Sequence, residues 1–340
     1  MFIIQTYGTA VLFCVVTMLC WGSWANTQKL AAGSWRFELF YWDYVLGIVG
    51  LALVAALTLG SIGEEGRSFL ADVRQADRAS IGSALWGGVL FNAANILLGA
   101  AIAIAGMSVA FPVGIGLALV IGVVVNYLNA PVGNAGLLFG GMVLIGVAIL
   151  LNAVAYRRTA ATGEAAGEAT SGAGVSSKGL LLSVVAGCLM GLFYGYVAGA
   201  MFPDFEQPQP GKLSPYTAVV FFSLGILLSN VVFNTLLMRR PFVGTPVSYA
   251  DYVRGTGRNH ATGVLGGMIW CLGMLFSILA SDKAGPAISY GLGQGATVVA
   301  ALWGIYVWRE FRAAPRSVGL LLNGMLVCYV VGLGLLIVAR

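Results

Sequence analysis

The chain has 340 residues, of which 59% are hydrophobic and only 9% are charged, and its mean hydropathy is +0.90. Soluble domains carry roughly 25% charged residues, so this composition excludes an ordinary soluble protein and predicts a surface that faces lipid. The net charge of +5 does not indicate nucleic-acid binding, because the basic residues stand at the ends of apolar stretches, where they orient membrane proteins.

Apolar stretches of about 20 residues, the length that crosses a bilayer as an α-helix, recur along the whole chain. The predicted fold class is an all-α membrane protein with ten transmembrane helices. They are expected at residues 6–28, 40–62, 81–105, 107–128, 134–155, 179–200, 215–238, 261–280, 286–307 and 316–339. Gly106 and the turn at 129–134 separate the three helices between Arg78 and Arg157, a stretch without any charged residue.

A polar segment at residues 157–178 interrupts this series of helices. Its small and polar residues cannot bury enough apolar surface to order the segment. We therefore predict a flexible linker at 157–178, between a first five-helix transmembrane repeat at 1–156 and a second one at 179–340.

The two halves resemble each other when one is displaced along the other. An ungapped displacement of 179 residues superimposes Gly88 on Gly267 and Tyr127 on Tyr306. The same displacement also matches Gly87, Ala105-Gly106, Phe111 and Gly114-x-Gly116 with Gly266, Ala284-Gly285, Tyr290 and Gly293-x-Gly295. Since each half has an odd number of helices, the second must enter the membrane upside down. Two inverted five-helix repeats are typical of alternating-access transporters, with the substrate at the midplane between the halves.

The positions of lysine and arginine predict the orientation in the membrane. Twelve of the 18 lie in the loops after helices one, three, five, seven and nine, and the other six lie on the opposite side. Because cytoplasmic loops carry the excess of positive charge, we expect a multi-pass protein of the inner (cytoplasmic) membrane. Its linker should be cytoplasmic and both of its termini outside.

Residue types that support catalysis or cofactor binding are rare in the apolar spans. The five cysteines lie in apolar stretches without metal-ligand spacing, so no metal or cofactor is expected. One histidine and no carboxylate in the middle of a span argue against an intramembrane enzyme. The linker has no Gly-Lys-Ser or Gly-Lys-Thr, so ATP is not expected to supply the energy.

Polar and aromatic residues share faces in spans from both halves. Such residues are costly in lipid and tend to mark pathways or helix contacts. The candidate substrate-binding residues are Trp21, Trp24, Asn26, Asn92, Asn95, Phe111, Tyr194, Tyr196, Trp270, Tyr290 and Gln294. Rings could stack on the aromatic walls while amides satisfy the donors and acceptors of a neutral, ring-shaped solute. The alternative, for each residue alone, is a hydrogen bond between helices or a place in the interfacial aromatic belt.

Two carboxylates stand near the start of the second span. Glu38 and Asp43 are candidates for proton coupling. The alternative interpretation favours interfacial carboxylates that pair with Lys29 or Arg36 and cap the helix.

Three segments resemble the ureide permease family. Residues 106–129 are similar to its fourth helix, residues 284–312 to its ninth, and Phe40-Tyr-Trp-Asp-Tyr44 to its Leu-Asp-Tyr motif at the start of helix two. Bacterial glucose and rhamnose uptake proteins are more distantly similar. The resemblance implies the drug/metabolite transporter superfamily, with ten helices in two inverted halves. It also implies transport of allantoin, uracil and related compounds with protons. The phosphate-loop-like motif of the plant members' central loop is missing here.

The sequence therefore predicts a secondary transporter in the lipid bilayer that imports a ureide, nucleobase or nucleoside, with protons as the driving ion. A rhamnose-, ribose- or glucose-type sugar importer is the close alternative. A multidrug exporter would favour a carboxylate in the middle of a span, and a scaffold or receptor would show no solute flux. The oligomeric state stays open.

Overall fold

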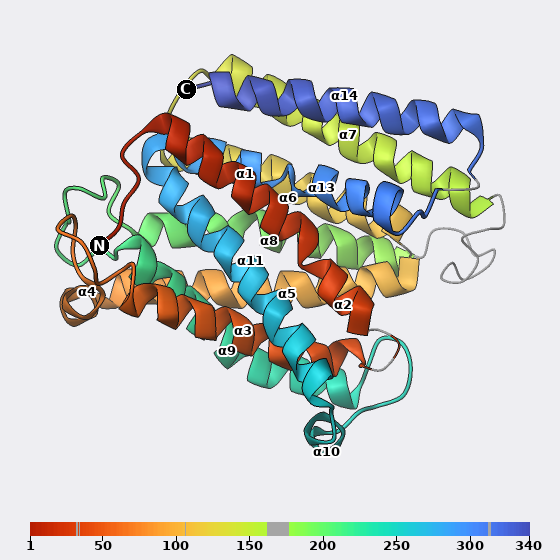
Figure 1. The fold of residues 1–340 in the computed structure, drawn as a ribbon, viewed down its shortest axis with the longest axis horizontal. Helices are drawn as coiled ribbons and strands as arrows, with labels where there is room; N and C mark the ends of the chain where they lie inside the picture. Colours follow the sequence, from red (N-terminus) through yellow and green to blue (C-terminus); the bar gives the residue numbers. More distant parts are fainter. Residues whose placement is uncertain (32, 34, 106, 162–176, 312–313) are drawn as a thin grey trace.

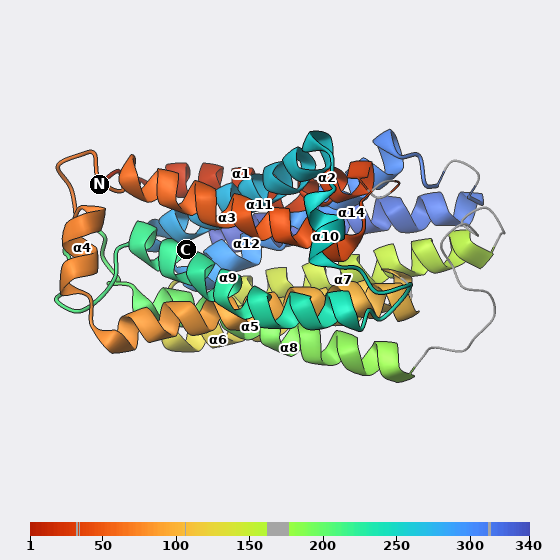
Figure 2. The same ribbon diagram turned by 90° about the horizontal axis from the view of Figure 1, so that it is seen from below.

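The computed structural model describes residues 1–31, 33, 35–105, 107–161, 177–311 and 314–340. Within these ranges, ten helical spans are long and apolar enough to cross a membrane. They run side by side along one direction of the molecule (Figures 1 and 2). The spans of the first half are α1 (Tyr7–Ser23) with α2 (Ala25–Ala31), α3 (Phe37–Leu57), α5 (Arg78–Ala105), α6 (Met107–Asn129) and α7 (Ala135–Ala161).

The second half has five spans as well. They are α8 (Ser177–Ala200), α9 (Pro215–Arg239), α11 (Gly257–Ala284), α12 (Pro286–Gly293) with α13 (Ala296–Leu302) and the π-helical turn η1 (Trp303–Val307), and α14 (Arg316–Val338). All ten spans expected from hydropathy are thus present as helices. The second one ends at Leu57 rather than at 62, because the chain turns there and the Gly60 amide donates to Ala55 O.

Two short helices lie in the connections, α4 (Phe69–Gln75) and α10 (Tyr249–Val253). Hydropathy does not detect them, since neither is long or apolar enough to cross a membrane. A capping box begins α10, in which Ser248 and Asp251 each accept a hydrogen bond from the other's backbone amide. Of the predicted linker, 157–161 continue α7 and 177–178 begin α8, while 162–176 lie outside the described residues.

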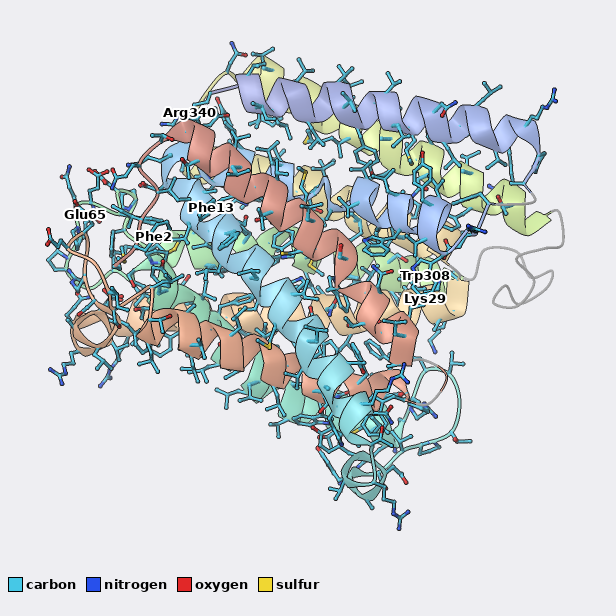
Figure 3. The ribbon with its side chains drawn as sticks, in the orientation of Figure 1. Phe2, Phe13, Lys29, Glu65, Trp308 and Arg340 are labelled. Atoms are coloured by element: carbon cyan, nitrogen blue, oxygen red, sulfur yellow. The ribbon has the colours of Figure 1, made fainter. Side chains whose placement is uncertain are left out.

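Both termini lie at one end of the molecule, and the ends of α7 and α8 that flank the linker lie at the other (Figure 1). Figure 3 shows the same division, with Arg340 and Glu65 at one end and Lys29 and Trp308 at the opposite end.

Glycines bring two pairs of helices into close contact. At Gly47 of α3 and Gly267 of α11, a Cβ atom would collide with the Val264 and Tyr44 carbonyl oxygens of the facing helix. The corresponding glycines of α9 and α5, Gly225 and Gly88, would meet the carbonyl oxygens of Leu85 and Phe222 in the same way. The α3–α11 and α9–α5 contacts are therefore built alike. In both, glycine lets the two backbones approach closely, as small residues do in membrane helices.

Candidate functional site

Aromatic rings from six helices meet in the middle of the molecule. Trp21 of α1 stacks on Trp270 of α11 with ring centroids 5.9 Å apart, and the Trp270 ring lies 4.3 Å from Phe91 of α5. Rings of α8, α9 and α12 continue this contact network. We call the set the central aromatic cluster, and its members are Trp21, Phe91, Phe193, Tyr194, Phe222, Trp270 and Tyr290. It draws on both halves of the chain and contains four of the predicted residues: Trp21, Tyr194, Trp270 and Tyr290.

The polar atoms of several predicted residues already have partners in other helices. Asn92 of α5 accepts from the Tyr41 hydroxyl at 2.9 Å and donates to Ser229 Oγ at 2.9 Å. Asn95 donates to the same Tyr41 hydroxyl at 3.2 Å. Because Asn92 is fully buried and both of its polar atoms are engaged, it joins α3, α5 and α9 rather than offering a free group.

The two predicted tyrosines of the cluster are also engaged. The Tyr194 hydroxyl lies 3.1 Å from Ser277 Oγ and 3.4 Å from Ser289 Oγ. The Tyr290 hydroxyl donates to Ala118 O at 3.2 Å. Their rings are 5.2 Å apart, and both hydroxyls are used within the protein.

Four polar groups in this region have no such partner. The Tyr44 hydroxyl is buried and unpaired. The indole Nε1 atoms of Trp24 and Trp270 and the carboxamide of Gln294 also make no hydrogen bond to any described residue. We call these four the open polar groups; the Tyr44 hydroxyl is buried, whereas the unpaired polar atoms of Trp24, Trp270 and Gln294 are accessible.

The open polar groups are linked to Trp21 by ring contacts or by neighbouring residues. Trp270 stacks on it, Trp24 follows one turn later in the same span, and the Tyr44 ring lies 4.8 Å from that of Trp24. Gly293, the neighbour of Gln294, faces the Trp21 ring so closely that a Cβ atom would stand 2.8 Å from it.

Gln294 lies at a tight turn within the ninth span. The helix α12 ends at Gly293 and α13 begins at Ala296, and the Gly295 amide donates to Leu292 O between them. Gln294 and Gly295 keep right-handed helical angles, so the span narrows here and continues into α13. Gln294 itself is 9% exposed.

A ladder of polar contacts closes the linker end of the molecule between the first and ninth spans. Trp308 Nε1 donates to Asn26 Oδ1 at 2.6 Å, and Trp303 Nε1 donates to Ser23 Oγ at 2.9 Å. Lys29 pairs with Glu310 at 2.5 Å and lies 4.4 Å from the Trp308 ring. Figure 3 shows Lys29 and Trp308 side by side at this end. Asn26 thus belongs to this ladder and lies outside the central aromatic cluster.

The remaining predicted residues lie apart from the cluster. Tyr196 is 41% exposed on the outer side of α8, and Phe111 of α6 is half-buried without a ring contact to the described residues. Glu38 is buried and pairs with Arg36 at 2.6 Å. Asp43 is 2% exposed and is bonded by Trp35, Tyr252 and His260. Among the described residues, no three His, Cys, Asp or Glu side chains come together as a metal-ligand set.

Comparison with known proteins decides the family. The ureide permease family model matches residues 40–173 and 169–339. The chain belongs to the ureide permease family. Its helices and its family identify it as a multi-pass membrane transporter for ureide-like small molecules rather than an enzyme.

Similar members of the ureide permease family come from plants. The chain is 24% identical to ureide permease 1 of Arabidopsis thaliana, over 99% of this chain and 98% of the relative. It is 25% identical to ureide permease 5 of the same plant, over 98% and 95% of the two chains. A solved crystal structure with 15% identity covers 95% of this chain and 96% of its own at a TM-score of 0.58, and thus shares the fold.

Several residues of this ureide permease homologue that shape the site were not predicted from the sequence. Phe91, Phe193 and Phe222 complete the aromatic cluster, and Tyr44 supplies an open polar group. Phenylalanine carries no polar signal in an apolar helix, so only its neighbours reveal a role. Tyr44 lies in the aromatic stretch that resembles the family motif, and that stretch could have indicated it.

Proposed function

We propose that this ureide permease homologue imports a small neutral ring-shaped metabolite, a ureide, nucleobase or nucleoside, by proton-coupled alternating access. The substrate would bind at the open polar groups beside the central aromatic cluster. The observation that carries this proposal is the Gln294 carboxamide, which lies at the tight turn between α12 and α13 in a residue only 9% exposed and makes no hydrogen bond to a described residue. A carboxamide offers both donors and an acceptor, which matches the adjacent N–H and C=O groups of ureides and nucleobases.

The character of the surrounding side chains favours a neutral solute. The central aromatic cluster and the open polar groups contain no charged residue, so a charged solute would lose its hydration without gaining a partner. Flat rings suit the stacked walls of Trp21 and Trp270, since offset stacking adds to the gain from burial. Sugars have hydroxyls on all sides, which four open polar groups would satisfy less completely.

Alternating access would arise from two inverted repeats at 1–156 and 179–340. The matched contacts of Gly47 with Val264 and of Gly225 with Leu85 support this arrangement, because an inverted repeat relates the first contact to the second. The ladder from Ser23 to Glu310 would be the gate on the linker side. The excess of lysine and arginine on that side supports a cytoplasmic linker, in a protein of the inner membrane.

Ligand-dependent stabilisation tests the binding site. The detergent-purified protein would be heated with allantoin, uracil, adenosine, rhamnose, glucose or tetraphenylphosphonium. A ligand at a hundred times its dissociation constant stabilises the folded state by about 2.7 kcal/mol, so we expect a higher melting temperature with allantoin, uracil or adenosine. Gln294→Met should abolish that rise. A rise with sugars alone would move the assignment to sugar uptake, and a rise with the lipophilic cation alone would contradict the proposal.

A further inference from the structure

A buried acid–base pair joins α3 to α11. Asp43 of α3 is 2% exposed, and its Oδ1 atom lies 2.9 Å from Nδ1 of His260, the only histidine of the chain. The Tyr252 hydroxyl donates to the same oxygen at 2.6 Å, and Trp35 Nε1 donates to Oδ2 at 3.2 Å. Three neutral or cationic donors therefore satisfy an ionised Asp43, which is the condition for keeping a carboxylate buried.

The two members of the pair differ in their access to water. The His260 side chain is 30% exposed, whereas that of Asp43 is 2% exposed. Trp35 and Tyr252 hold the imidazole edge-on, with ring centroids 5.2 and 4.9 Å from it. The imidazole of His260 is thus open to solvent, whereas the Asp43 carboxylate that it contacts stays dry.

The pair lies directly on the contact between α3 and α11. A Cβ atom at Gly263 of α11 would collide with Asp43, so the two helices touch at this point. A displacement of 179 residues brings Asp43 onto Phe222, and the second half therefore carries no matching carboxylate. The α3–α11 contact therefore has this acid–base pair, and the related α9–α5 contact does not. Movement of α11 along α3 separates Asp43 Oδ1 from His260 Nδ1.

Other charged groups near the pair are already engaged or stand at the surface. On α3, Glu38 pairs with Arg36 at 2.6 Å. On α10, Asp251 and Arg254 lie 3.9 Å apart at the surface, and burial together with the Asp43 hydrogen bond raises the pKa of Tyr252. On α11 itself Arg258 is exposed, and the nearby ends of α2 and α9 carry Lys29, which pairs with Glu310, and the exposed Arg239.

We propose that Asp43 and His260 together form the proton-binding site that couples transport to the proton gradient, an inference that rests on the proposed function. With Asp43 ionised, Nδ1–H of His260 donates to it. A proton that adds to Nε2 in a conformation open to the outside gives an imidazolium paired with the carboxylate, and no other bond forms or breaks. In the described conformation the exposed His260 lies on the linker side, and Nε2 returns the proton to water there.

A ligand-free measurement tests the pair itself. Because His260 is the only histidine, protein labelled with carbon-13 histidine and purified without a histidine tag gives a single imidazole signal by NMR. The Asp43 carboxylate can only accept from His260 Nδ1, so it fixes the ring tautomer, and the signal of Asp43→Asn at one fixed pH should move away from its wild-type position. Arg258→Gln, which removes an exposed charge two residues from His260 without touching the pair, is the control and should keep the wild-type signal. An Asp43→Asn signal at the wild-type position would overturn the proposal.

Proteoliposomes test the coupling separately from transport. For one proton per solute, a pH difference of one unit supports about tenfold accumulation. In allantoin-loaded vesicles, Asp43→Asn and His260→Gln should still exchange external radiolabelled allantoin, yet neither should accumulate it in empty vesicles under the pH difference. Accumulation by either variant at the wild-type level would overturn the proposal. If the wild type exchanges allantoin but does not respond to the pH difference, the proton-site proposal is overturned while solute transport stands. If the wild type does not exchange allantoin at all, the result counts against the proposed function instead.

Discussion

Replacing Gln294 by methionine separates a binding role from a structural one. Methionine keeps the length and volume of the side chain but removes its hydrogen-bonding groups. The Gln294 carboxamide makes no hydrogen bond to the described residues, so the substitution breaks no internal bond. We expect the melting temperature of the ligand-free protein to stay close to the wild-type value, because volume-conserving substitutions cost less than about 1.5 kcal/mol.

The effect on binding follows from the bonds that the carboxamide can make. A ureide or nucleobase could accept one hydrogen bond from Gln294 and donate another to it, and neutral hydrogen bonds contribute about 0.5–1.5 kcal/mol each. Their combined loss of about 1–3 kcal/mol would raise the dissociation constant by about 5- to 150-fold. Isothermal titration calorimetry of the detergent-solubilised protein with allantoin or uracil would measure this change.

Asn92→Ala is the matched control, since Asn92 is a buried amide that the protein itself uses. Its removal deprives the Tyr41 hydroxyl of its acceptor and Ser229 Oγ of a donor, and an unpaired buried donor costs about 1–3 kcal/mol. We expect this variant to melt at a lower temperature than Gln294→Met. If Gln294→Met binds as tightly as the wild type, or if it is destabilised as much as Asn92→Ala, the assignment of Gln294 to the substrate is wrong.

Three further predictions test the gate, the helix contacts and the topology. Glu310→Gln removes the charge that pairs with Lys29 and accepts from Tyr156, and this should loosen the ladder. A cysteine placed at Ser23 should then react faster with a water-soluble maleimide than it does without Glu310→Gln. An unchanged rate would contradict the gate. Gly267→Val places side-chain atoms against the Tyr44 carbonyl and should lower the melting temperature by more than the same change at Gly50, where nothing lies within 4 Å of the added Cβ; equal losses would contradict the glycine contact. A cysteine at Thr170 should be protected from an impermeant reagent in intact cells while one at Glu65 reacts; the reverse pattern would invert the orientation.

Hydropathy alone predicted the membrane helices because each span needs a continuous apolar stretch. This requirement leaves a strong signal in all ten spans. The short helices α4 and α10 leave none, since their formation depends on local caps such as Ser248 with Asp251. The tight turn at Gln294 was also missed, because the flanking glycines could equally have served helix packing.

The site was harder to predict than the fold. Tyr194 and Tyr196 were both candidates, yet residues two apart in an α-helix point about 200° away from each other, so only one of them could face the centre. Tyr194 is fully buried there and Tyr196 is 41% exposed. Asn92 and Gln294 show the second difficulty, since a polar residue looks the same in sequence whether a neighbouring helix satisfies it or not.

Solute flux tests the central proposal most directly. Purified protein in proteoliposomes, with an alkaline interior, would be given radiolabelled allantoin, uracil or adenosine, beside Gln294→Met and empty vesicles. The proposal predicts uptake of at least one of these ring-shaped solutes by the wild type, little uptake by Gln294→Met, and no competition from an excess of tetraphenylphosphonium. If wild-type vesicles take up none of them faster than empty vesicles do, or if Gln294→Met transports them at the wild-type rate, the proposed substrate class or its site is wrong.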